Sequence, residues 1–210
     1  MSLGIFDAIA MTSDAHSSRS ASVGRRSLVL RWQRWALCAG CWLASLLVGL
    51  AQDTVSKEYQ IKAAYLYNFA KFVEWPPQSF TNQLAPLVIG VFDPNPFGSE
   101  LQTIAVSHQI NGRAIVIKPV ANAAQAAGVH LLFIGATEDD RVAATLVALN
   151  GTGVLTVGES DRFAAAGGII RFVRSDDKVR FQINAAAAEH QGLKISAQLL
   201  KLATATHREP

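Results

Sequence analysis

Apolar and aromatic residues recur every three or four positions between residues 58 and 77, where the aromatic side chains are densest. This spacing is typical of a helix that buries one face. Pro76 and Pro77 cannot continue a helix, so we expect the helix to end near Trp75 and to pack on a sheet. The residues predicted to form its buried stripe are Ile61, Ala64, Tyr65, Phe69, Phe72 and Val73.

Six apolar runs farther along the chain have the length and composition of strands. They are residues 87–92, 113–120, 129–134, 154–157, 169–173 and 179–183. Helical patterns or turn signals separate the first five, whereas a short polar link joins the last two, as in an antiparallel hairpin. We therefore predict a single three-layer α/β domain. Its mixed, mostly parallel sheet has about five or six strands, is flanked by helices and ends in a C-terminal antiparallel hairpin.

The predicted helices lie between and after these strands. Asn95 is expected to cap a helix that starts at Pro96, because proline is favoured at the first helical position. A terminal helical region is expected to be interrupted near Gly192. The predicted helical ranges are 96–107, 121–127, 137–149, 161–166 and 185–203.

Residues 1–51 have a different pattern from the rest of the chain. Four arginines between positions 25 and 34 precede residues 35–50, which carry no charge, and small residues lead to Ala51. This order of positive, apolar and small residues is typical of a secretory signal peptide. We therefore expect an N-terminal leader with a cleaved signal at 1–51 and an exported α/β domain at 52–210. An uncleaved signal that anchors the protein in a membrane is the alternative.

Removal of the leader changes both the charge and the cysteine content. The whole chain has a formal net charge of +3, but the leader holds 5 of the 19 Lys and Arg residues and 2 of the 16 Asp and Glu residues, which leaves 14 of each sign. A neutral domain lacks the basic surface that nucleic acid binding requires. Cys38 and Cys41 also fall in the leader, so residues 52–210 can form no disulfide.

The sequence contains no recognisable catalytic constellation. Ser160 follows a predicted strand, but its surroundings lack the second glycine of a nucleophile elbow. Gly151 and Gly153 precede a strand, whereas phosphate-binding glycines follow one. The histidines of the domain lack metal-ligand spacing and are expected at the surface or at helix caps. We predict a protein that is not an enzyme, with no catalytic residue, metal or cofactor. The histidines concerned are His108, His130, His190 and His207.

Two sets of residues are candidates for binding another protein. One set is aromatic and lies off or beyond the predicted buried stripe. The other is basic and surrounds the predicted hairpin, where it either protects a solvated sheet edge or faces an acidic partner. The first set is Tyr67, Trp75 and Pro76, and the second is Arg171, Arg174, Lys178 and Arg180.

Several segments, in the same order along the chain, carry a family resemblance. The most specific runs from Lys62 to Pro76, with the sequence KAAYLYNFAKFVEWP, and another is the strand and loop IGVFDPNPFG at 89–98. The remaining segments are 110–113, 130–134, 154–157, 167–172, 179–184 and 193–200. Together, over about residues 57–204, they resemble the YfiR family of small periplasmic proteins.

This resemblance implies a periplasmic, often dimeric repressor. Members of the family bind the periplasmic sensor part of an inner-membrane diguanylate cyclase, and an outer-membrane lipoprotein can sequester them. The output is cyclic di-GMP and hence biofilm formation. Well-known members carry disulfides, whereas residues 52–210 have no cysteine, so a thiol switch is excluded if the leader is cleaved.

A different class of function stays open beside the repressor. In α/β sheets, ligands bind in crevices at the C-terminal ends of the strands. The residues at these ends are Asp93 to Pro96, Gly135 and Gly158. The alternative is therefore a periplasmic sensor domain that binds a small metabolite there.

Overall fold

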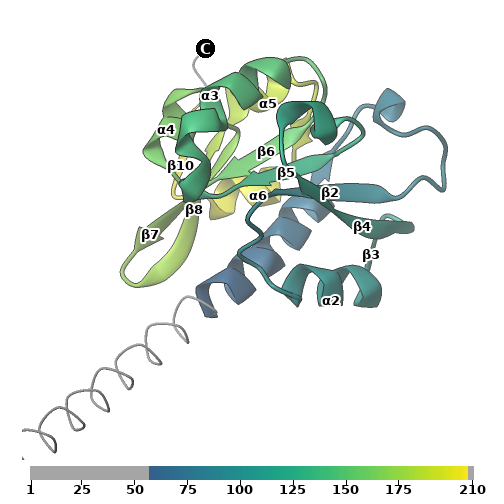
Figure 1. Ribbon diagram of the computed structural model, residues 1–210, viewed down its shortest axis with the longest axis horizontal. Helices are drawn as coiled ribbons and strands as arrows, with labels where there is room; N and C mark the ends of the chain where they lie inside the picture. Colours follow the sequence, from purple (N-terminus) through teal and green to yellow (C-terminus); the bar gives the residue numbers. More distant parts are fainter. Residues whose placement is uncertain (1–56, 208–210) are drawn as a thin grey trace, which may run out of the picture. The chain divides into compact units, whose positions relative to one another are not determined.

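The computed structural model describes residues 57–207, so the predicted leader and its cleavage after Ala51 lie outside the described residues. The described chain forms an eight-stranded sheet and a separate two-stranded ladder. Figure 1 shows α3 and α4 on one side of the sheet, and the helical residues 57–72, called here the first helix, and α2 on the other.

All six predicted strands are present, with ends shifted by up to two residues. Four further strands of two or three residues are too short to leave a periodic signal in the sequence. The strands are β1 (Val73–Glu74), β2 (Leu87–Phe92), β3 (Gln109–Ile110), β4 (Arg113–Val120), β5 (Leu131–Ile134), β6 (Leu155–Gly158), β7 (Ile170–Ser175), β8 (Lys178–Asn184), β9 (Lys194–Ile195) and β10 (Ala205–His207). The helices are α2 (Glu100–Ser107), α3 (Asp139–Ala148), α4 (Asp161–Ala165), α5 (Ala185–His190) and α6 (Ala197–Leu202), with short 3-10 turns η1 (Pro77–Ser79), η2 (Ala123–Ala126) and η3 (Ala136–Glu138).

The strand order confirms the predicted fold class. The large sheet runs β10-β8-β7-β6-β5-β2-β4-β3, and β1 pairs with β9 apart from it. Neighbours from β4 through β2, β5 and β6 to β7 are parallel. β7 and β8 form the predicted antiparallel hairpin, with Asp176 and Asp177 at positive φ in its two-residue turn. This turn geometry matches the twist of the two strands.

The central strands are buried on both faces. In β5, Leu131 and Phe133 belong to the core that includes the first helix and α2, whereas Leu132 and Ile134 belong to the core beneath α3 and α4. This explains why the strand is a continuous apolar run and not an alternating one.

The buried face of the first helix differs from the predicted stripe. Phe69 and Val73 are buried as predicted, but Ile61 is 47% exposed. Ala64 is also exposed, while Tyr65 and Phe72 are half-buried. Residues that the stripe omitted take their places in the core: Lys62, Ala63, Leu66 and Ala70. The buried face is thus rotated so that it includes Lys62, whose ammonium pairs with the buried carboxylate of Glu159.

The helix predicted from Pro96 begins later, at Glu100. Asn95 instead accepts a hydrogen bond from the Phe97 backbone through its side chain (2.9 Å), which forms a tight turn. This turn sends the Phe97 ring into the core, edge-on to Phe133 at a centroid distance of 4.7 Å. Packing of one aromatic residue therefore delays the helix.

No helix within residues 57–207 combines the length and the apolar character needed to cross a membrane.

Candidate partner-binding surface

The β7–β8 hairpin extends beyond the strands on either side of it (Figure 1). β6 pairs only with Ile170 and Arg171 of β7, and β10 pairs only with residues 182–184 of β8. The hairpin tip is therefore held by its own ladder and by the start of the first helix. Between them lies a hollow of about 470 Å³, called here the hairpin groove. Its lining residues are Lys57, Glu58, Ile61, Tyr65, Arg174, Asp177, Lys178, Val179 and Arg180.

The hairpin groove has an apolar floor and a charged rim. Ile61 is 47% exposed in it. The half-buried ring of Tyr65 packs 5.5 Å from the ring of Phe181. Val179 completes the floor, while Lys178 and Arg180 are exposed at the rim. The groove thus presents an apolar surface that water contacts, bordered by cations.

Arg174 joins the two sides of the groove. Its guanidinium lies 3.7 Å from Glu58 on the first helix and 3.5 Å from Asp177 in the hairpin turn. These contacts are exposed and individually weak.

A buried ion network fixes the first helix against the end of β6. The ammonium of Lys62 lies 2.6 Å from a carboxylate oxygen of Glu159 and 2.6 Å from one of Glu58. The side chains of Lys62 and Glu159 are only 7% and 9% exposed. The Tyr59 hydroxyl donates to the other oxygen of Glu159 at 3.1 Å. Burial raises the pKa of the Tyr59 phenol, and the negative charge of Glu159 raises it further.

A second hollow of about 600 Å³, called here the polar hollow, lies at the C-terminal end of β6. Two of the buried polar atoms around it, Asp139 Oδ1 and Arg171 Nε, have no hydrogen-bond partner among residues 57–207. Such atoms are costly to leave unpaired, so they favour a polar occupant. The lining mixes both charges: Glu58, Lys62, Asp139, Glu159, Ser160, Asp161, Arg162, Arg171, Phe172, Val173, Arg174 and Val179.

The predicted ligand crevice agrees with the polar hollow only in part. Glu159, which directly follows Gly158, lines the hollow, but Gly135 and residues 93–96 do not. Ser160 accepts a hydrogen bond from the Phe163 backbone and so caps α4, as a polar loop residue does.

The four predicted basic residues are divided between the two hollows. Arg171 forms an ion pair with Asp161 and donates to the Gln182 side chain at 2.8 Å. It lines the polar hollow, Lys178 and Arg180 line the hairpin groove, and Arg174 lines both.

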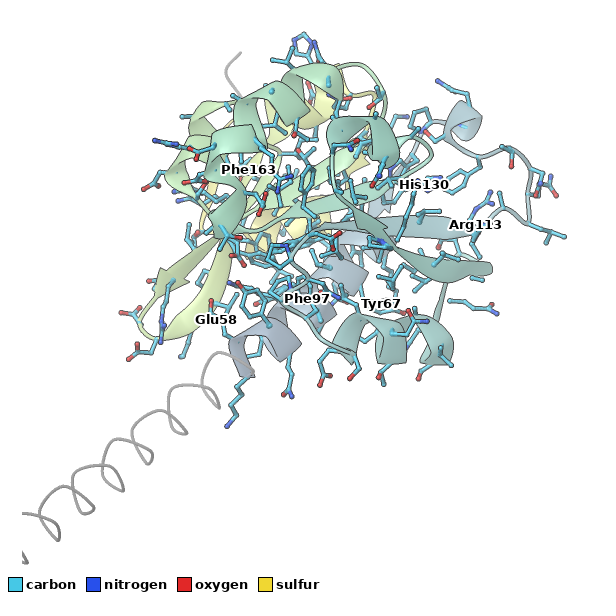
Figure 2. All side chains as sticks on the ribbon, in the orientation of Figure 1. Glu58, Tyr67, Phe97, Arg113, His130 and Phe163 are labelled. Carbon is cyan, nitrogen blue, oxygen red and sulfur yellow. The ribbon has the colours of Figure 1, made fainter. Side chains whose placement is uncertain are left out.

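The predicted aromatic residues do not join this surface. The half-buried Tyr67 ring lies 5.1 Å from the ring of His108. Tyr67 is about 13 Å farther along the first helix than Glu58, and Figure 2 shows the two at different points of that helix. Half-buried Trp75 donates from its indole nitrogen to the His130 carbonyl at 3.1 Å, and Pro76 packs near Gly153 and Gly192.

His130 is buried, which corrects the expectation that it lies at the surface or at a cap. Its Nδ1 accepts from the Val88 backbone at 3.1 Å, and its Nε2 lies 3.1 Å from the Ser79 carbonyl. The Phe80 ring stacks on the imidazole at 4.4 Å, and Arg113 lies 3.8 Å over Phe80 (Figure 2 labels His130 and Arg113). Burial is the main reason why the pKa of His130 is lowered. The charge of Arg113 adds to this, and the bond to Ser79 opposes it.

Among the side chains that the structure describes, no group of three His, Cys, Asp or Glu residues could hold a metal ion.

The sequence matches the YfiR/HmsC-like protein family over residues 59–204. No curated protein matches the chain. Among solved structures, one similar chain is a conserved domain protein from Vibrio cholerae, with 17% identity, a TM-score of 0.43 and coverage of 57% of this chain and 54% of that chain. Another is an ABC domain in complex with L-Trp from Streptococcus pneumonia, with 12% identity, a TM-score of 0.41 and coverage of 61% and 57%. The chain thus spans little more than half the length of each.

Proposed function

The chain belongs to the YfiR/HmsC-like family, and from this we propose that it is a repressor that binds the periplasmic part of an inner-membrane diguanylate cyclase. Proteins of this family are periplasmic, regulatory and non-catalytic, and they act through protein partners. The observation that carries the proposal is the family match, which covers nearly all the described residues. Occupation of the cyclase would lower cyclic di-GMP and biofilm formation.

The hairpin groove supports the proposal that the protein acts by binding another protein. It combines an exposed apolar floor with cations from the first helix, β7 and β8: Lys57, Arg174, Lys178 and Arg180. Apolar contacts surrounded by polar groups are the usual arrangement of protein interfaces.

Deletion of the gene tests the proposed function directly. In a strain that retains the cyclase, we expect cyclic di-GMP to rise and the gene supplied in trans to restore it. The purified full chain is expected to bind the periplasmic fragment of the cyclase in a calorimetric titration. Unchanged cyclic di-GMP together with no binding to that fragment would contradict the proposal.

Export is the second part of the proposal. Residues 1–51 act as leader and signal peptide, and residues 52–210 form the periplasmic domain. Mass spectrometry of the protein recovered from the periplasm is expected to give an N-terminus at Gln52. An intact chain that remains in the membrane fraction would instead support the uncleaved anchor.

Two further partners belong to the same proposal. A homodimer is expected in sedimentation experiments on the purified protein, and a monomer at all concentrations would exclude it. An outer-membrane lipoprotein is expected to compete with the cyclase fragment for the repressor. If the lipoprotein does not weaken binding of the repressor to the cyclase fragment, it is not a partner of this protein.

The polar hollow favours a second candidate function, the sensing of a small periplasmic ligand. Its support is the pair of unpartnered atoms, Asp139 Oδ1 and Arg171 Nε, in the lining of an open hollow. A thermal-shift screen with polar metabolites is expected to give a stabilising compound whose effect is lost in Arg171→Gln. A screen in which no compound stabilises the protein would count against this function.

A further inference from the structure

The cations on the rim of the hairpin groove are not balanced by nearby carboxylates. Glu58 contacts both Lys62 and Arg174, and Asp177 contacts Arg174. Lys178 and Arg180 form no ion pair with any carboxylate of residues 57–207. Lys178 and Arg180 therefore offer two exposed positive charges to a binding partner, and exposed Lys57 of the first helix lines the same groove.

The backbone beside these cations is also open. β8 pairs with β7 along one side, but on its other side β10 reaches only residues 182–184. The Phe181 carbonyl is occupied by the Thr204 backbone at 2.9 Å. Residues 178–180 have no strand neighbour on that side within the described chain, so an extended segment could add backbone hydrogen bonds there.

The apolar floor supplies the third element of the surface. Ile61, Tyr65 and Val179 form a concave patch directly inside the charged rim. A single large apolar side chain bound there would be removed from water, which favours binding. The flanking cations would select for negative charge on either side of it.

We propose that the hairpin groove docks an extended acidic segment of a partner protein. One large apolar side chain of the segment rests on Ile61, Tyr65 and Val179, and its carboxylates lie against Lys178 and Arg180. The proposal rests on the proposed function, in that the protein acts by occupying a partner. A flat anionic membrane fits less well, because Asp177, with its side chain 96% exposed at the hairpin turn, would face it.

The first test uses the full chain and a fluorescent heptapeptide in which acidic residues flank one leucine. Fluorescence anisotropy is expected to show binding that weakens as salt is added. Replacement of the leucine by serine, or of the acids by their amides, is expected to weaken binding about tenfold or more. Binding to phosphatidylglycerol vesicles but not to the peptide would overturn the proposal.

The second test uses matched variants. Lys178→Glu with Arg180→Glu, and separately Ile61→Asp, are each expected to weaken peptide binding about tenfold or more. The controls are Lys194→Glu with Lys201→Glu, and Val147→Asp, which change exposed residues outside the groove. They are expected to bind as the parent does. Equal affinity in the groove variants, with circular dichroism spectra unchanged, would overturn the proposal.

The periplasmic cyclase fragment separates the two proposals. If it binds the parent chain and the groove variants equally, the docking site is wrong while the repressor function stands. If the acidic peptide binds the groove and the cyclase fragment does not bind at all, the docking site stands and the cyclase is not the partner.

Discussion

The Phe163 ring of α4 lies against two glycines that are ten residues apart in sequence, Gly158 and Gly168. A Cβ added to Gly158 at the end of β6, or to Gly168 before β7, would overlap the ring. In the sequence, Gly168 stands only two residues beyond the predicted helical range 161–166. The contact with a ring from another part of the chain has no local signal.

Gly168→Ala and Gly158→Ala are each expected to lower the free energy of unfolding by about 1–3 kcal/mol through overpacking. Urea denaturation of the variants measures this loss. Gly135→Ala is the control, because its Cβ would meet only ordinary contacts, 3.8 Å from Phe133. Phe163→Leu is expected to recover part of the loss in Gly168→Ala. Equal stability of all three glycine variants would contradict this packing.

His130 is expected to make stability depend on pH. Burial lowers its pKa from the ordinary value of 6.5, so the folded protein binds fewer protons than the unfolded chain just below that pH. The stabilisation is complete above about pH 6.5 and is lost as the pH falls through the lowered pKa. Urea unfolding measures the free energy of unfolding between neutral and mildly acidic pH. We expect this free energy to fall as the pH falls, and His130→Gln to make the fall less steep.

The exposed His108 provides the control for this pH dependence. His108→Gln is expected to retain the parent slope. A His130→Gln variant with the same slope as the parent would show that the imidazole titrates normally in the folded protein.

At the scale of elements, the ion network holds the first helix to the β6–α4 loop. Lys62→Met leaves the buried Glu159 carboxylate without its cation and is expected to cost about 3–5 kcal/mol of unfolding free energy. Lys62→Met combined with Glu159→Gln removes both charges and is expected to recover much of that loss. A double-mutant cycle by chemical denaturation measures the interaction free energy between Lys62 and Glu159. If the losses of the two single variants simply add, the two side chains do not stabilise each other.

The elements were largely predictable because long strands and helices carry periodic apolar patterns. The hairpin position and the parallel sheet follow from these patterns and from the lengths of the connections. The inward position of Lys62 was not predictable, because its partner Glu159 is distant in sequence. The hairpin cations were found from charge clustering, whereas the buried role of His130 depends on bonds to two other segments.

At the scale of the whole molecule, two cores share one sheet. Leu132→Ala on one face and Phe133→Ala on the other are expected to cost about 2–5 and about 3–5 kcal/mol, respectively. Trp75 is the only tryptophan of residues 52–210, so its fluorescence reports on one region of that part of the chain. Because the sheet couples the cores, fluorescence and far-UV circular dichroism are expected to give the same unfolding midpoint.

The exposed Val147→Ala variant is the control and should change stability by less than about 0.5 kcal/mol. Separate fluorescence and dichroism midpoints in either core variant would show that the two faces unfold independently.

Glu58, Arg174 and Val179 line both the hairpin groove and the polar hollow. Anything bound in one hollow therefore changes the side chains available to an occupant of the other. Thermodynamic linkage requires the effect to be reciprocal: the factor by which a small molecule alters the affinity for a docked segment equals the factor by which that segment alters the affinity for the molecule. With a shared wall of three side chains, a chemical signal could change partner occupancy without any rearrangement of the sheet, and a titration from either side would measure the same coupling.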